Sequence, residues 1–209
     1  IQIKSKDSII IKAPLFVPNV KIHQFVNEKQ KWINKKIAKL SENESSMSIP
    51  FKNNNKIMYL GKSYTIKKTE SPLMHPLTFS DQFLLYNTIE NISTHDYITI
   101  HLKKLAKDIL LDQSETISNT LGLKANTIKI KSLTSRWGSC STLKNINLNW
   151  KLIHSPINVI NYVIIHEFVH LLHMNHSETF WQTVKKYCPT YLKDKKWLKD
   201  YGDFVQNVY

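Results

Sequence analysis

The sequence predicts an α+β protein whose two parts differ in structure. Over residues 1–92, short apolar alternations are separated by proline and asparagine, which is typical of strands and turns. From residue 93 onward, apolar residues recur at helical spacing. The length of 209 residues and the 42% hydrophobic content suit one large or two small globular domains. We therefore expect a strand-rich N-terminal domain over residues 1–92 and a helix-dominated domain over residues 93–209.

The N-terminal part is predicted to hold short strands and one helix. Weak alternation up to Pro14 indicates strand, and apolar residues at helical spacing between Pro18 and Ser41 indicate a lysine-rich amphipathic helix with its apolar face on a sheet. Residues 57–66 are typical of a hairpin that turns near Gly61. Residues 79–89 predict further short strands.

The second part is predicted to begin with a long helix that Gly122 ends. Strands are expected over residues 127–133 and 146–152, and the second of these alternates apolar side chains with Asn and Lys. A helix over residues 156–172 follows, with Ser155 as its cap. Another helix is expected over residues 177–187.

A zinc-binding pattern lies inside the expected helix over residues 156–172. His166 and His170 are four residues apart, so both imidazoles share one helical face and can reach one ion. Zinc suits imidazole nitrogen, and a catalytic zinc keeps one position open for water. Glu167 is one step round the helix, where a carboxylate can accept a proton from that water without binding the metal. An ordinary apolar helix would have to desolvate these three polar side chains without partners.

A catalytic zinc usually has three protein ligands, so a third must follow these two histidines. His176 lies just beyond Asn175, a residue that tolerates the left-handed turn needed to bring the chain back over the metal. Glu178 and His173 are the alternatives. Glu178 also suits the first turn of a helix, and His173 is separated from His166 by about 10 Å of helical rise. We expect one zinc ion per chain, with His176 as the favoured third ligand.

Arg136 and Cys140, which precede the strand over residues 146–152, are further candidates for catalytic residues. Arg136 is the only arginine of the chain, and its planar guanidinium suits a substrate carboxylate or the negative charge that develops beside a metal. A surface ion pair or stacking on Trp137 is the alternative. Cys140 with His154 as its base is a rival nucleophile, although no local signature supports it.

Composition limits the partners and the location. The net charge of +13 favours anionic partners, nucleic acid included, but the lysines are scattered rather than clustered. Two cysteines do not make a disulfide framework, which predicts a reducing compartment. No apolar stretch approaches the roughly 20 residues that span a bilayer. We expect a cytoplasmic protein with no membrane contact.

The ordered motifs of the second half resemble the YgjP-like metallopeptidase-domain family. The resemblance is strongest over residues 130–190, and the helix with Trp32-Ile33 and the hairpin near Gly61 are similar to the N-terminal part of that family. Phe168 stands where the family usually has leucine. The matching segments are Arg136-Trp137-Gly138-Ser139-Cys140-Ser141, Ile146-Asn147-Leu148-Asn149-Trp150, Pro156, Tyr162-Val163-Ile164-Ile165-His166-Glu167-Phe168-Val169-His170-Leu171, Asn175-His176-Ser177 and Phe180-Trp181.

This resemblance implies a zincin-like catalytic half, related to SprT-like proteins, and a bacterial-type cytoplasmic protein. It implies zinc ligands at His166, His170 and His176, with Glu167 as the general base. Proteins of the family are described as metal-dependent hydrolases or peptidases, and some are linked to pyrophosphate hydrolysis of nucleoside triphosphates, notably UTP. The related SprT-like zincins process proteins attached to DNA.

We therefore expect a zinc-dependent hydrolase, a metallopeptidase that uses a metal-activated water with Glu167 as general base and Arg136 steadying the charged intermediate. The strand over residues 146–152 is expected to form the rim above the metal, where an extended peptide can add to the sheet. One alternative is a UTP pyrophosphatase on the same metal site, although the chain has only four glycines and no glycine-rich phosphate loop. The other is a nucleic-acid or protein binding module with a vestigial zinc site.

Overall fold

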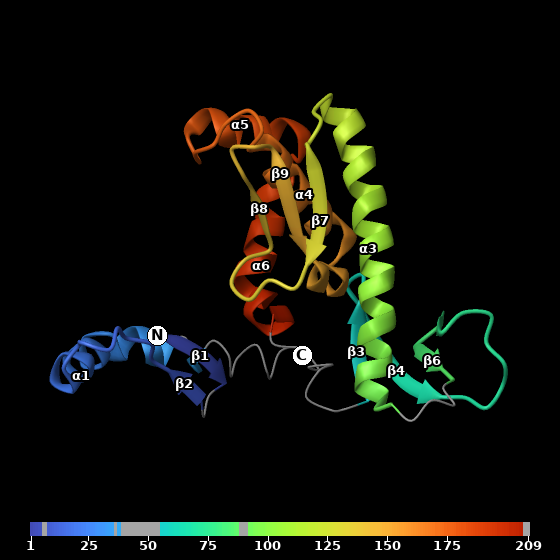
Figure 1. Ribbon diagram of the computed structural model, residues 1–209, viewed down its shortest axis with the longest axis horizontal. Coiled ribbons are helices and arrows are strands. Elements are labelled where there is room, and N and C mark those ends of the chain that lie inside the picture. The colour runs from blue at the N-terminus through green and yellow to red at the C-terminus, as the bar shows by residue number, and fades with distance from the viewer. Residues whose placement is uncertain (6–7, 36, 39–54, 88–91, 207–209) are drawn as a thin grey trace. The chain divides into compact units, whose positions relative to one another are not determined.

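The computed structural model describes residues 1–5, 8–35, 37–38, 55–87 and 92–206. The chain forms two compact units, Ile1–Ile49 and Pro50–Tyr209, and Figure 1 shows their elements. The division follows residue 49, and the expected domain boundary between residues 92 and 93 remains a prediction. The predicted α+β class is confirmed, with strands in the N-terminal half followed by several helices.

The first unit contains a small hairpin and a helical segment. Strands β1 (Gln2–Ser5) and β2 (Ser8–Ile10) pair antiparallel, as the alternation before Pro14 predicts. Helix α1 (Asn19–Glu28) ends where Lys29 leaves helical geometry, and the chain is helical again over residues 30–35. The expected single helix is therefore interrupted, and its last residues, 39–41, lie outside the described residues. Helix α1 also buries none of its residues, so the predicted apolar contact between this helix and a sheet is wrong for α1.

A four-stranded sheet opens the second unit. Its strands are β3 (Lys56–Tyr59), β4 (Lys62–Lys68), β5 (Leu77–Ser80) and β6 (Phe83–Tyr86), in the order β3-β4-β6-β5. The predicted hairpin is confirmed, because Leu60 and Gly61 both have positive φ and join two antiparallel strands. A Cβ atom on Gly61 would lie 2.8 Å from Cγ of Pro156, so glycine also permits this close approach. Residues 88–89 of the predicted strands lie outside the described residues.

A long helix, α3 (Thr94–Leu121), follows the four-stranded sheet. In Figure 1 it runs from that sheet along strand β7 (Thr127–Lys131). Ser93 caps the helix by accepting a hydrogen bond from the backbone N–H of Asp96. Gly122 ends it in the left-handed conformation with φ of 64°, as predicted. Its apolar side fills the core with Leu102, Ala106 and Leu110 among others, all with no exposed surface.

The second sheet has three strands in the order β7-β9-β8. Strand β7 (Thr127–Lys131) lies parallel to β9 (Asn145–Asn149), and β8 (Gly138–Cys140) lies antiparallel to β9. Because β9 is paired on both sides, the prediction that an extended peptide can add to the strand over residues 146–152 is wrong. The strand also stops at Asn149, whose side chain accepts a hydrogen bond from the backbone N–H of Lys151 and starts a 3-10 helix, η1 (Trp150–His154).

Three helices complete the second unit: α4 (Ile157–Val169), α5 (Glu178–Tyr187) and α6 (Tyr191–Gln206). Helix α4 contacts α3, α5, α6 and β8, which makes it the centre of the core. Its apolar side chains Val159, Ile160, Ile164 and Phe168 have no exposed surface. The helix ends at Val169, three residues earlier than predicted. No helix among the described residues has the length and apolar character that crossing a bilayer requires.

Candidate metal centre

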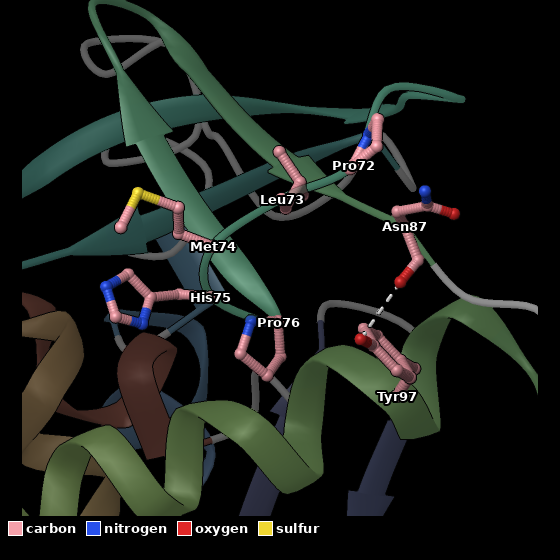
Figure 2. A pocket seen from close by; sticks show the side chains of 7 residues that line it. All are labelled: Pro72, Leu73, Met74, His75, Pro76, Asn87 and Tyr97. Atoms are coloured by element: carbon pink, nitrogen blue, oxygen red, sulfur yellow. Dashed lines mark hydrogen bonds between the residues drawn. The ribbon is translucent and has the colours of Figure 1, made fainter.

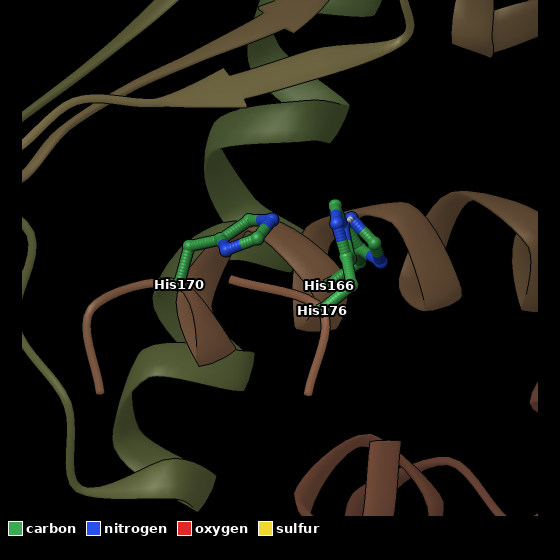
Figure 3. Close-up of side chains that lie close together, drawn as sticks. All are labelled: His166, His170 and His176. Atoms are coloured by element: carbon green, nitrogen blue, oxygen red, sulfur yellow. Dashed lines mark hydrogen bonds between the residues drawn. The ribbon is translucent and has the colours of Figure 1, made fainter. Parts of the chain in front are cut away.

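Three histidines converge at the C-terminal end of α4. His166 lies in the last turn of the helix, His170 is its C-cap residue, and His176 lies just before α5. One nitrogen from each ring lies within 4.8 Å of the others, and the Nε2 atoms of His166 and His176 are 3.0 Å apart. Figure 3 shows the ring of His170 directed toward the other two rings. Two facing Nε2 atoms at this distance can be satisfied by a shared proton or by a shared cation.

The chain reverses because α4 ends between the second and third histidines. The backbone N–H groups of Leu172 and His173 both donate to the carbonyl of Val169, which closes the last turn of the helix. The following residues bring His176 back over the helix end. The two alternative ligands lie outside the group of three. His173 places Nε2 3.4 Å from the hydroxyl of Thr183, and Glu178 accepts a hydrogen bond from its own helix neighbour Gln182.

A backbone carbonyl orients the second imidazole. Nδ1 of His170 is 2.9 Å from the carbonyl oxygen of His173, an oxygen that can only accept, so Nδ1 carries the proton. The Nε2 lone pair of His170 is then free to bind a metal ion. This arrangement, with three imidazoles and no carboxylate in the cluster, fits a divalent transition metal such as zinc.

The environment keeps the first imidazole neutral. Burial, followed by the neighbouring His170 and His176 rings and by Lys195, lowers the pKa of His166 to about 3. Burial, His170 and Lys195 also lower the pKa of His176. Metal binding requires deprotonated imidazole nitrogen. Each neutral ring therefore has one nitrogen lone pair that can bind a metal ion at neutral pH.

Glu167 lies between α4 and strand β8, with 6% of its surface exposed. A Cβ atom on Gly138 would lie 2.5 Å from Oε1 of Glu167 and 2.6 Å from its Cγ, so only glycine leaves room for this side chain. Burial raises the pKa of Glu167 to about 8, and the positive charge of Arg136 opposes that rise. A carboxyl group in this range can take up and release a proton near neutrality.

Arg136 stands on the loop that leads into β8, and its side chain is exposed. Its backbone carbonyl accepts hydrogen bonds from the side-chain amides of Asn149 and Gln206, each 3.2 Å away. The loop is thereby held to β9 and to α6. Arg136 acts on Glu167 through its charge and does not join the three histidines.

The rival nucleophile lacks the properties that a reactive thiol needs. Burial and the charge of Glu167 raise the pKa of Cys140, whereas nucleophilic thiols have a lowered pKa. His154 is fully buried, and its Nδ1 donates to the carbonyl of Met58 at 2.6 Å. Burial lowers the pKa of His154 to about 4. The structure therefore gives the Cys140–His154 pair no support.

Aromatic side chains of α5 support the imidazoles, a role that the sequence analysis missed. The ring of the fully buried Phe180 lies 4.9, 4.6 and 4.8 Å from those of His166, His170 and His176. Trp181 stacks on His176, with centroids 5.6 Å apart and ring planes 23° apart. Helical spacing could not indicate this role, because His176 lies before the first residue of α5 and meets these two rings only in the folded chain.

The sequence of this chain matches a known protein family over almost its whole length. A family model described as "YgjP-like, metallopeptidase domain" matches residues 1–201. The chain belongs to the YgjP-like metallopeptidase-domain family. The resemblance that the motifs indicate is thus confirmed, and membership supports a hydrolase of the metallopeptidase type.

Solved structures similar to this YgjP-like chain include two metallopeptidase zymogens. Abylysin of Pyrococcus abyssi is 23% identical with a TM-score of 0.37, and the match covers 43% of this chain and 93% of abylysin. Jannalysin of Methanocaldococcus jannaschii is also 23% identical with a TM-score of 0.37, over 42% of this chain and 94% of jannalysin. No curated protein matches the YgjP-like chain.

A separate hollow of about 400 Å³ lies at the four-stranded sheet of the YgjP-like chain. Figure 2 shows its lining, which comes from the loop between β4 and β5, the end of β6 and the start of α3. The hydroxyl of Tyr97 donates to the carbonyl of Asn87, and the amide of Asn87 donates to the carbonyl of Ser71. The polar side chains of Tyr97 and Asn87 are thus used within the fold, and none of the three clustered histidines lines the hollow. The lining residues are Pro72, Leu73, Met74, His75, Pro76, Asn87 and Tyr97.

Proposed function

We propose that this protein is a zinc-dependent metallopeptidase. The observation that carries the proposal is the convergence of His166, His170 and His176, with the buried Glu167 directly after His166 on the same helix. Family membership supports a peptide substrate, and the three-imidazole donor set supports zinc as the metal. The free thiols of Cys140 and Cys188 are consistent with a reducing compartment such as the cytoplasm.

Zinc bound by the three imidazoles would polarise the scissile carbonyl and lower the pKa of a bound water toward neutrality. Glu167 accepts the proton of the attacking water on a carboxylate oxygen and delivers it to the leaving amine nitrogen. Burial raises the proton affinity of this carboxyl group, and the positive charge of Arg136 opposes that rise. Arg136 also offers a guanidinium to the negative charge that forms on the carbonyl oxygen.

Strand β8 is the side of the sheet on which we place the substrate. It lies at the edge of the β7-β9-β8 sheet, so one side of its backbone has no strand partner in that sheet. An extended peptide can pair with such an edge through main-chain hydrogen bonds. Because Gly138 of β8 touches Glu167, a peptide paired there runs past the general base.

The test compares the purified protein with its Glu167→Gln variant. We expect about one zinc ion per chain in both by elemental analysis, and cleavage of unfolded casein by the wild type only. Glu178→Gln is the matched control, because Glu178 is an exposed acid at the start of α5, outside the histidine group. Casein cleavage by the Glu167→Gln variant at the wild-type rate would refute the assignment. Release of pyrophosphate from UTP without casein cleavage would point to a nucleotide substrate instead.

A further inference from the structure

One exposed lysine is held at the edge of the metal centre. Nζ of Lys195, on α6, lies 4.0 Å from the centroid of the Trp181 ring. Trp181 in turn stacks on His176 and on Tyr191, with centroids 5.6 and 5.5 Å away. A cation over an indole face is attracted by the ring electrons, so this ammonium group has a preferred position. The stack joins Lys195 to the third histidine.

The charge of Lys195 is not neutralised by a neighbouring carboxylate among the described residues. The adjacent carboxylate, Asp194, is buried and accepts hydrogen bonds from Asn158 and from Thr190 instead. The α6 side of the site therefore carries a positive charge that no described carboxylate neutralises. Arg136, on the loop before β8, is a separate positive charge.

We propose that Lys195 binds a carboxylate group of the substrate, so that the site prefers acidic peptides. This inference rests on the proposed peptidase function and assigns its substrate class. An extended chain advances about 3.3 Å per residue. Given the spacing from Nζ to Trp181 and from Trp181 to His176, the carboxylate belongs within about three residues of the scissile bond. An Asp or Glu side chain and a free C-terminus offer the same chemistry.

The expected preference is modest because the pair is exposed to water. Exposed ion pairs change an equilibrium constant by up to about fivefold. Stacking on Trp181 reduces the side-chain freedom that Lys195 loses on binding, so we expect the upper part of that range, about threefold to fivefold. Lys196 is the matched control, since it is an exposed lysine of the same helix turned about 100° away.

The experiment measures peptide binding by fluorescence anisotropy to the zinc-loaded Glu167→Gln protein. One series of labelled, end-blocked alanine-rich hexapeptides carries a single Glu or a single Gln at each position in turn. A second series lacks Glu and has a free or an amidated C-terminus. We expect one acidic form to bind about threefold to fivefold more tightly than its neutral partner. Tighter binding of a Glu peptide in the first series would identify a side-chain carboxylate. Tighter binding of the free C-terminus in the second series would identify a terminal carboxylate.

The lysine variants decide whether Lys195 is responsible. Lys195→Met keeps the side-chain length and should abolish the preference, Lys195→Arg should retain it, and Lys196→Met should leave it unchanged. A preference that survives Lys195→Met, an equal loss in Lys196→Met, or the same affinity for acidic and neutral peptides would each overturn the proposal. Casein cleavage by the wild type in any of those cases leaves the peptidase function standing. Lys195-dependent binding without casein cleavage would count against the peptidase function alone.

Discussion

The carboxyl group of Glu167 lies directly against the backbone of Gly138. A Cβ atom at position 138 would come within 2.5 Å of Oε1 of Glu167, far closer than ordinary contact. Helix α4 and strand β8 can approach one another here only because one of the two residues has no side chain. The same contact removes the carboxyl group from water, and that burial is the main cause of its raised pKa.

Replacing Gly138 by alanine should therefore displace Glu167, the proposed general base. We expect the Gly138→Ala variant to lose about a hundredfold in kcat/KM on casein and about 1–3 kcal/mol in the free energy of unfolding, because overpacking moves Glu167 or β8. Zinc content should stay near that of the wild type. Ser139→Ala on the same strand is the control, and wild-type activity in Gly138→Ala would contradict this account of the contact.

The third ligand can be tested against its nearest histidine neighbour. We expect His176→Ala to weaken zinc affinity by at least about a hundredfold, measured by competition with a chromogenic chelator. His173→Ala should keep most of the affinity, because His173 orients His170 through its backbone carbonyl and alanine retains that carbonyl. Equal losses in the two variants would show that His176 is not a ligand.

Phe180 should stabilise both the fold and the metal centre. It has no exposed surface and contacts all three imidazoles, so Phe180→Ala should lower the free energy of unfolding by about 3–5 kcal/mol. Zinc affinity should fall as well, because the rings lose their common support. Phe180→Leu fills more of the space than alanine does. Its free energy of unfolding in urea and its zinc affinity in chelator competition should therefore lie between those of the wild type and those of Phe180→Ala. Wild-type zinc affinity in folded Phe180→Ala would show that the ring is dispensable for the site.

Protonation of His154 should lower the free energy of unfolding in acid, independently of any bound metal. Its pKa is about 4 in the folded protein against about 6.5 when unfolded, so the unfolded chain binds more protons between these values. The free energy of unfolding should therefore fall as pH drops from 6.5 to 4, by about 3 kcal/mol from this residue. The difference between wild type and His154→Gln, from urea unfolding at several pH values, isolates the contribution. A difference independent of pH would contradict it.

The helix with its two histidines, the Gly61 hairpin and the Gly122 helix end could be predicted because each rests on local spacing or on backbone freedom. Strand β8 could not. Its three residues, Gly138–Cys140, show no alternation that marks a strand, and they become one only by pairing with β9. The contact of Gly138 with Glu167 also depends on this pairing, so no pattern along the chain indicates it.

The turn between His170 and His176 would respond to metal supply. It carries two of the three imidazoles and the carbonyl that orients one of them, so a bound ion would clasp the end of one helix to the start of the next. Amide hydrogens of residues 171–177 would then exchange slowly in the loaded protein and faster after chelation. In a cell short of that metal, proteolysis would begin at this turn, and degradation of the protein would follow the loss of the ion.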